Sequence, residues 1–556
     1  MQPGRLLRLA VLLSLAAAAC RLTAPAAPAE TRPPTPTLAQ TEPPARQGTP
    51  TRAPVSPTAR IPGSPSPEES AAPSAGAGET PDLQAGLEAV LAACGGQEQA
   101  RALRPGSELE WGGAPFPACY DLSLELEDRP EFKGRARVTL ANQSGAALEE
   151  LVFRLYPNAD VIFGGVLRVL QARAGGESVQ PEPLLEDGTA LRLPLGRPLQ
   201  PGAVLEVELE FEGRAPQDFG SSFGVYGVFN YSSRAGLMTL ANAYPLLAAW
   251  EEGAWQYEPV NGTGDAVVSE TALYRVEVRA PQGWAIAATG SALDESAQAA
   301  PALRVASGPV RDFMLVAGPG LVERQAEAGG VRVRHWGLAG GEDRWEEALQ
   351  VALDSLAVFE ERFGPYPYAE LDIVAVPLRL ASGVEYPGLV LIEQEEYTAA
   401  STVFLGIVVS HEVAHQWWYA VVGNDVLEAP WQDEALTSFS SLLYQQEHQP
   451  AAYRGTLEAY REQLEFAGEA TAGQSIFLPL EAYDTGPGAY STVVYLKGAL
   501  FFVELREELG EEAFFEALQD YYQAFRYRLV EPEALLEAFE NACGCELDSF
   551  YREWGL

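Results

Sequence analysis

The sequence predicts a multi-domain protein in which an N-terminal all-β sandwich or saddle domain precedes a mostly helical domain. Its 556 residues, 47% of them hydrophobic, suffice for two or three separate cores. Between residues 118 and 318, apolar and polar residues alternate in short runs that Gly, Pro, Asn and Asp separate, which is typical of antiparallel strands. Beyond residue 344, apolar residues recur at helical spacing instead.

The first 20 residues have the layout of a secretory signal. Arg5 and Arg8 give it a positive start, and residues 9–19 form an apolar run that is too short to span a bilayer. The run ends at Cys20, and the segment resembles a bacterial lipoprotein signal, in which the cysteine is lipidated and becomes the mature N-terminus. An ordinary cleaved signal is the alternative. We therefore expect an extracytoplasmic protein, at the bacterial cell surface or in the periplasm, with a lipid anchor in the membrane.

Composition and periodicity divide the rest of the chain. Residues 21–82 are rich in Pro, Ala, Thr, Ser and Gly and cannot bury enough apolar surface to fold, so we expect a disordered tether. A short helical lead-in over 83–117 precedes a β-sandwich domain over 118–320 and a helical domain over 321–556. The expected helices of that last domain are 344–363, 433–447, 493–508, 511–526 and 532–542, besides the segment around residue 411.

Charge and cysteine content narrow the possible functions and compartments. The formal net charge of −40 argues against a nucleic-acid partner, because phosphate binding needs a basic surface. After the signal, no run of about 18 apolar residues predicts a transmembrane helix. The four cysteines besides Cys20 fit an oxidising compartment and allow three pairings, of which we favour Cys94–Cys119 with Cys543–Cys545. A second metal site made of these cysteines does not match the usual zinc spacings.

The segment VVSHEVAHQWW, residues 408–418, holds two of the four histidines of the chain. Positions i and i+4 lie on one face of a helix, so His411 and His415 can direct two imidazoles at one point. A catalytic zinc ion takes three protein ligands and keeps one position open for water. Glu412, turned about 100° around the helix from His411, can face that water and take its proton. Core histidines are the alternative, but a lone buried carboxylate in an uncharged helix is costly unless metal chemistry compensates it.

A third metal ligand is expected at Glu434, 19 residues after His415. Pro430 precedes the expected start of a second helix, and a turn through residues 423–425 would bring that helix back to the first. Taken alone, Glu434 would be a solvated acid at a helix start. Together, His411, His415 and Glu434 predict one Zn²⁺ per chain. The other two histidines, His335 and His448, are not expected to bind the metal.

The spacing from the H-E-V-A-H run to Glu434 resembles the zinc signature of the aminopeptidase N family of zinc metallopeptidases, the gluzincins that include leukotriene hydrolase. SGVEYPG, residues 382–388, resembles the G-x-M-E-N motif of that family, although Ser, Val and Tyr replace its Gly, Met and Asn. AYSTVVYLKG, residues 489–498, resembles its catalytic-tyrosine segment. The resemblance covers Ala118 to the C-terminus and implies a β domain followed by a thermolysin-like (α+β) catalytic domain.

The resemblance also implies roles for individual residues. Glu385 would hold the free α-amine of a peptide, and the strand GLVLI that follows could pair with an extended substrate. Tyr495 would donate a hydrogen bond to the developing oxyanion, with Tyr490 as the competing candidate. Lys497, one of only two lysines in the chain, has no assigned role.

The function implied is that of a zinc-dependent metallopeptidase, first of all an aminopeptidase that removes N-terminal residues from peptides by attack of metal-activated water. An endopeptidase or an epoxide hydrolase with the same site is one alternative. A non-enzymatic, surface-anchored peptide-binding protein is another. The expected partners are peptide substrates, and the membrane through the lipid anchor.

Overall fold

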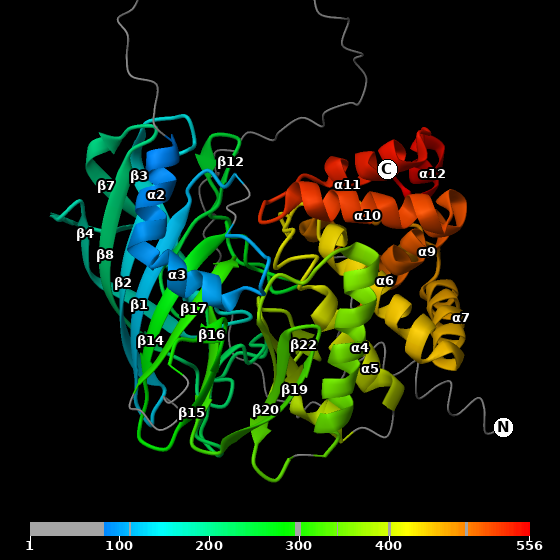
Figure 1. The fold of residues 1–556 in the computed structure, drawn as a ribbon, viewed down its shortest axis with the longest axis horizontal. Helices are drawn as coiled ribbons and strands as arrows, with labels where there is room; N and C mark the ends of the chain where they lie inside the picture. Colours follow the sequence, from blue (N-terminus) through cyan, green and yellow to red (C-terminus); the bar gives the residue numbers. More distant parts are fainter. Residues whose placement is uncertain (1–82, 110–112, 295–301, 342, 399–401, 484–487) are drawn as a thin grey trace, which may run out of the picture. The chain divides into compact units, whose positions relative to one another are not determined.

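The computed structural model describes residues 83–109, 113–294, 302–341, 343–398, 402–483 and 488–556. The predicted signal, Cys20 and the tether lie outside the described residues. The described chain has a β-rich part, blue to green in Figure 1, and a C-terminal helical part, yellow to red, as the sequence predicted. In these ranges, no helix has the length and apolar character that crossing a membrane requires.

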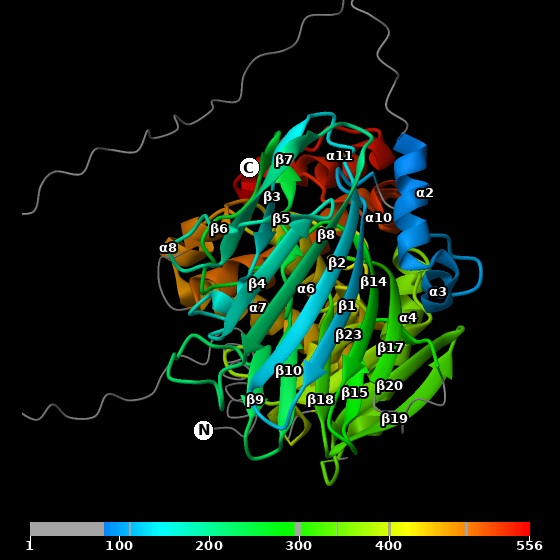
Figure 2. The same cartoon turned by 90° about the vertical axis from the view of Figure 1, so that its left-hand side faces the viewer.

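The largest sheet has eight strands among the described residues, in the order β16-β17-β14-β1-β2-β8-β4-β5, and Figure 2 shows it face-on. Neighbouring strands are antiparallel, except for β1 and β14, which are parallel. The strands are β1 Ala118–Leu126, β2 Glu131–Ala141, β4 Val166–Ala174, β5 Glu177–Val179, β8 Val204–Arg214, β14 Ala272–Arg279, β16 Ser291–Ala292 and β17 Ala302–Val310.

Two smaller sheets, each of four described strands, and a short hairpin complete the β part. One sheet runs β15-β18-β10-β9 and the other β11-β3-β7-β6. Their strands are β3 Leu148–Arg154, β6 Glu182–Pro183, β7 Ala190–Leu199, β9 Phe229–Ser232, β10 Leu237–Ala241, β11 Leu246–Leu247, β15 Ala285–Ala288 and β18 Met314–Gly318. The hairpin pairs β12 Trp250–Glu251 with β13 Ala254–Trp255.

The inner faces of these sheets share one hydrophobic core. Phe132 of β2 packs edge-on against Phe229 of β9, and the Tyr120 hydroxyl of β1 accepts a hydrogen bond from the backbone N–H of Leu247 in β11. The opposite face of β2 is charged, as the period-two alternation requires, because side chains of a strand point alternately to the two faces. This layered arrangement confirms the predicted sandwich.

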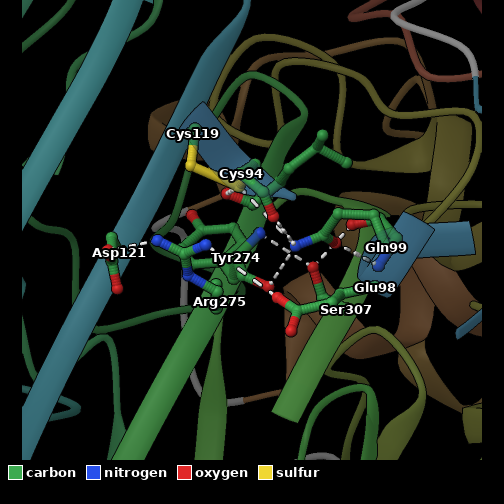
Figure 3. The surroundings of a disulfide bond; sticks show 10 residues. Cys94, Glu98, Gln99, Cys119, Asp121, Tyr274, Arg275 and Ser307 are labelled. Carbon is green, nitrogen blue, oxygen red and sulfur yellow. Dashed lines mark hydrogen bonds and ion pairs between the residues drawn. A yellow bond between two sulfur atoms is a disulfide. The ribbon is translucent and has the colours of Figure 1, made fainter. Parts of the chain in front are cut away.

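The lead-in forms α2 Leu83–Cys94, α3 Gly96–Gln99 and the short 3₁₀ turn η1 Ala100–Ala102, which lie beside β14 and β17 (Figure 2). The Cys94–Cys119 disulfide joins α2 to β1, and Cys543–Cys545 also forms, so the favoured pairing is confirmed. Figure 3 shows the buried Gln99 beside the first disulfide. Its amide donates to the Tyr274 carbonyl at 2.9 Å and accepts from the Gly308 N–H at 2.9 Å.

The lead-in then reaches the C-terminal part. The N–H of Arg104 donates to the carbonyl of Pro367 at 2.9 Å, the N–H of Ala369 donates to the carbonyl of Ala102 at 2.8 Å, and the Arg104 guanidinium pairs with Glu360. Residues 94–104 therefore form a strap, which is disulfide-bonded to the β part at one end and hydrogen-bonded to the C-terminal part at the other.

The C-terminal part begins with a five-stranded sheet of described strands in the order β19-β20-β21-β23-β22. These strands are β19 Leu321–Ala328, β20 Val331–Leu338, β21 Glu370–Val376, β22 Gly383–Val384 and β23 Leu389–Glu393. The GLVLI strand, β23, lies between β21 and β22, and the short β22 pairs only with Leu391 and Ile392 of β23. β22 ends the sheet beside it, and the pairing of β23 with an extended substrate stays a prediction.

Helices make up most of the remaining described residues: α4 Trp345–Phe363, α5 Thr402–Ala414, α6 Trp431–His448, α7 Pro450–Ala467, α8 Glu469–Ala472, α9 Gly498–Leu509, α10 Glu511–Phe525, α11 Pro532–Cys543 and α12 Asp548–Trp554. Shorter turns of 3₁₀ helix are η2 Tyr156–Asn158, η4 Gln394–Tyr397 and η5 Leu480–Tyr483. Residues 493–497, expected to begin an α-helix, instead belong to a π-helix, η6 Ser491–Lys497.

Candidate metal centre

The metal centre is built at the end of α5. This helix was expected to continue through the tryptophan pair, but it ends at Ala414. The i,i+4 geometry survives, because the N–H of His415 still bonds the His411 carbonyl at 3.3 Å. The two imidazole Nε2 atoms consequently approach each other to 3.2 Å.

Glu434 reaches the same point from the first turn of α6. Between the helices, Asp425 accepts hydrogen bonds from the N–H groups of Leu427 and Glu428, which fixes the turn that brings the chain back. Oε2 of Glu434 lies 3.1 Å from Nε2 of His411 and 3.5 Å from Nε2 of His415. Its side chain is buried.

These three residues fit a zinc ion. Each offers one donor atom, and the three donor atoms all lie within 4.8 Å of one another. Two neutral imidazoles and a carboxylate are zinc ligands, and three protein ligands leave a fourth position open. Nδ1 of His415 lies 3.0 Å from the Trp418 carbonyl, which orients the ring so that Nε2 faces the centre. Burial alone would raise the pKa of the Glu434 carboxyl, but hydrogen bonds from both histidines hold it well below its usual range.

Glu412 points into the cavity beside the centre. Its carboxyl is buried, and Oε2 has no hydrogen-bond partner among the described residues. Burial raises the pKa of this carboxyl, and the charge of His415 opposes that rise. A buried acid with a free oxygen next to a metal centre is suited to accept a proton from water.

Glu385 lies close to Glu412. One carboxylate oxygen each from Glu385 and Glu412 and a ring nitrogen of His415 all lie within 4.8 Å of one another. The segment that carries Glu385 is tied to the metal segment by Gln416, whose side chain accepts from the Gly388 N–H at 2.7 Å and donates to the Tyr386 carbonyl at 3.2 Å. Gln416 directly follows the second histidine, but only this contact reveals its positioning role.

Asp265, from a loop of the β part, is a pocket residue that the sequence did not reveal. Its carboxyl lies beside that of Glu385, which lines the same cavity. Burial and the charge of Glu385 together raise the pKa of Asp265. No local motif marks Asp265, because it meets Glu385 only where the β part covers the cavity.

Tyr495 and Tyr490 occupy different places. The Tyr495 hydroxyl donates to Oε1 of Glu434 at 2.5 Å, and its ring stacks beside that of His411. The Tyr490 hydroxyl lies against Gly264 instead, where an added β-carbon would meet it at 2.8 Å. Tyr495 is therefore the phenol at the metal centre.

His335 and His448 lie elsewhere. His335 is buried beside Trp345, with Nε2 at 2.7 Å from the Tyr397 hydroxyl. His448 ends α6 beside Asp354. Neither lines the cavity, in accord with the sequence analysis.

The cavity has a volume of about 380 Å³. Both parts of the chain line it, and its wall is mainly apolar. Its charged lining residues are Asp265, Asp312, Glu385, Glu412 and Glu434, and no lysine or arginine occurs among the described lining residues. The cavity is therefore suited to an apolar group that carries a positive charge at one end.

Two histidines one helical turn apart, a glutamate from the next helix and a buried carboxylate with a free oxygen are the groups that a zinc centre with an adjacent proton acceptor requires. Residues 347–554 match the model of the Peptidase family M1 domain. The C-terminal part of this chain is therefore similar to the peptidase family M1 domain and to aminopeptidase N.

Known proteins resemble part of the chain. It is 28% identical over 234 residues to aminopeptidase M1-A of Oryza sativa subsp. japonica, a match that covers 40% of this chain and 27% of that protein. It is 27% identical over 228 residues to aminopeptidase N of Lactococcus lactis subsp. lactis, over 39% of this chain and 27% of that protein. The match thus spans little more than a quarter of the length of these relatives.

A solved structure resembles both parts of the chain. The M1 zinc metallopeptidase of Deinococcus radiodurans superposes with a TM-score of 0.57 and 21% identity, over 82% of this chain and 96% of that chain. The order of a β-rich part followed by a helical catalytic part is therefore that of a known two-part fold.

Proposed function

We propose that this chain is a zinc-dependent aminopeptidase, which removes residues from the free amino end of peptides. One observation carries the proposal: Glu385 shares a single cavity with the zinc donor set, and its carboxylate lies within 4.8 Å of the Glu412 carboxylate and of a nitrogen of His415. A peptide whose ammonium group meets Glu385 would have its first carbonyl near the metal centre.

The residues divide the chemistry among them. Zinc, when bound, acidifies a water molecule and polarises a carbonyl oxygen. Glu412 accepts the proton of the attacking water and returns it to the leaving amine. The Tyr495 hydroxyl donates a hydrogen bond to the oxygen on which negative charge develops. Glu385, with Asp265 beside it, binds the substrate ammonium and so selects a free amino end.

The free-amine site favours an aminopeptidase over an endopeptidase or an epoxide hydrolase. The amino terminus of a peptide supplies an ammonium group that can pair with the two acids. An internal peptide bond or an epoxide supplies no cation. Burying two acids without such a partner is costly.

We also propose that the enzyme acts outside the cytoplasm, held to a bacterial membrane by a lipid on Cys20. The signal-like layout of residues 1–20 supports this location, and so do two disulfides, which persist in oxidising compartments. Metabolic labelling with a fatty acid analogue tests it, because Cys20→Ser would abolish the label. Labelling that survives this change would refute the anchor.

A panel of reporter substrates tests the proposed activity. Each aminoacyl reporter is paired with its N-acetylated form and assayed on the full chain, before and after zinc removal by a chelator and after zinc is restored. We expect the free-amine forms to be hydrolysed far faster than the acetylated forms, with loss of activity in chelator and recovery with zinc. Equal hydrolysis of free and acetylated forms would point to the endopeptidase alternative.

A further inference from the structure

Tyr495 lies in an unusual piece of backbone. The π-helix Ser491–Lys497 precedes α9 directly, and π-helical turns are rare and concentrate at functional sites. Such a turn has poorer geometry than an α-helix, so contacts from outside the segment must hold it. Two neighbouring residues, Lys497 and Gly498, supply such contacts from two elements.

Lys497 ties the segment to the chain that follows α8. Its ammonium group donates hydrogen bonds to the carbonyl of Ala472 at 2.9 Å and of Gln474 at 2.6 Å. It also lies 6.0 Å from the ring centroid of Trp554 in α12. Donors with a full charge form stronger hydrogen bonds than neutral ones, and both acceptors are backbone atoms with no side-chain freedom.

Gly498 lets the segment press against α6. A β-carbon at position 498 would lie 2.3 Å from the β-carbon of Ala435 and 3.3 Å from its Cα. Ala435 directly follows the metal ligand Glu434. The glycine therefore permits the close approach of this segment to α6, and Tyr495 donates its hydrogen bond to Glu434 between the two elements.

We infer that Lys497 is a positioning residue for Tyr495. It anchors the π-helix from the side of α8 while Gly498 packs on α6, and together they fix the Tyr495 hydroxyl at the metal centre. The inference rests on the proposed aminopeptidase function for its kinetic readout. It assigns a role to a lysine that touches neither the cavity wall nor the metal ligands.

A double-mutant cycle tests this role. Lys497→Met is made in the wild-type chain and in Tyr495→Phe, and kcat and KM are measured on a free-amine reporter. We expect Lys497→Met to lower kcat about tenfold with little change in KM, a loss within the usual range for residues coupled through a backbone shift. In the Tyr495→Phe chain the same change should have no further effect, because the hydroxyl that Lys497 positions is gone.

The chain provides a matched control. Lys133, the only other lysine, is exposed on β2 far along the sequence from the site, so Lys133→Met should leave kcat unchanged. Lys497→Arg should retain most of the wild-type activity because arginine also has charged hydrogen-bond donors. If Lys497→Met does not fold, Lys497→Gln, which keeps one donor, takes its place in both backgrounds.

A second readout does not depend on turnover. In the metal-free protein, amide hydrogen exchange over residues 488–500 should be faster in Lys497→Met than in wild type or in Lys133→Met. An equal loss of kcat in both backgrounds, or an unchanged kcat and exchange rate, would overturn the inference. A wild-type chain that hydrolyses no reporter would instead contradict the proposed function, while the exchange measurement would still test the anchoring.

Discussion

Gly383 lies directly against the carboxylate of Glu412: a β-carbon at position 383 would come within 2.2 Å of Oε1. The G-x-M-E-N-like segment therefore does two things, since it carries Glu385 and also leaves room for the proton-accepting acid. We predict that Gly383→Ala displaces the Glu412 carboxylate and lowers kcat by about 10², the usual contribution of a positioned acid or base.

Zinc content should stay at one per chain in Gly383→Ala, because the three atoms nearest to an added β-carbon all belong to Glu412, which is not a metal ligand. Elemental analysis beside kcat measures this separation. Gly455→Ala is the matched control, because Gly455 is exposed in α7 and nothing lies within 4 Å of the added carbon. Glu412→Gln sets the lower limit of activity. A wild-type kcat in Gly383→Ala would show that the carboxylate moves aside without cost.

The amine-binding role of Glu385 predicts a selective loss. Glu385→Gln should lower kcat/KM for free-amine reporters by about 10², since it removes the charge that an ammonium group needs in a buried site. The low activity on N-acetylated reporters should not fall further. Asp265→Asn should cause a smaller loss, because Glu385 remains. Equal losses on free and acetylated substrates would contradict the assignment.

The different places of the two phenols predict unequal effects. Tyr495→Phe should lower kcat by about 10²–10³, the usual loss on removal of one oxyanion donor. Tyr490→Phe should change kcat little, because its hydroxyl lies against Gly264. Thermal unfolding of both variants provides the control for folding. A larger effect at Tyr490 would reverse the roles.

The charge of the cavity predicts substrate preference. A carboxylate on the substrate side chain and a carboxylate of the cavity wall, if about 8 Å apart, repel by about 2 kcal/mol at an effective dielectric constant of about 20. One such repulsion corresponds to a factor of about 30 in kcat/KM. An N-terminal Glu reporter should therefore be cleaved at least that much more slowly than its uncharged Gln counterpart, while Leu and Phe reporters react well. Similar rates for Glu and Gln would contradict a net negative charge in the cavity.

The two disulfides should differ in their contribution to stability. Cys94 and Cys119 are separated by 25 residues, and Cys543 and Cys545 by only 2. The entropy of loop closure then predicts a loss of about 3 kcal/mol for Cys94→Ser with Cys119→Ser, against about 1.5 kcal/mol for the second pair. Denaturant unfolding of both double variants measures the difference. The second pair serves as the control for the removal of any disulfide.

The metal centre was largely predictable from the sequence, because its key spacings are local. The i,i+4 interval of His411 and His415 fixes their common direction wherever that turn is helical. The helix–turn–helix that follows returns Glu434 to them with few alternatives. The period-two alternation likewise predicted the sandwich, since only one face of each strand can be buried.

Tertiary packing alone decided the rest. The sequence did not indicate that Asp265 of the β part meets Glu385, that Gln416 ties the two site segments together, or that Lys497 anchors a π-helix. Nor did it give the position of β23 inside its sheet. These contacts join residues far apart in the chain, and they depend on which surfaces pack together, which no periodicity or spacing within one segment records.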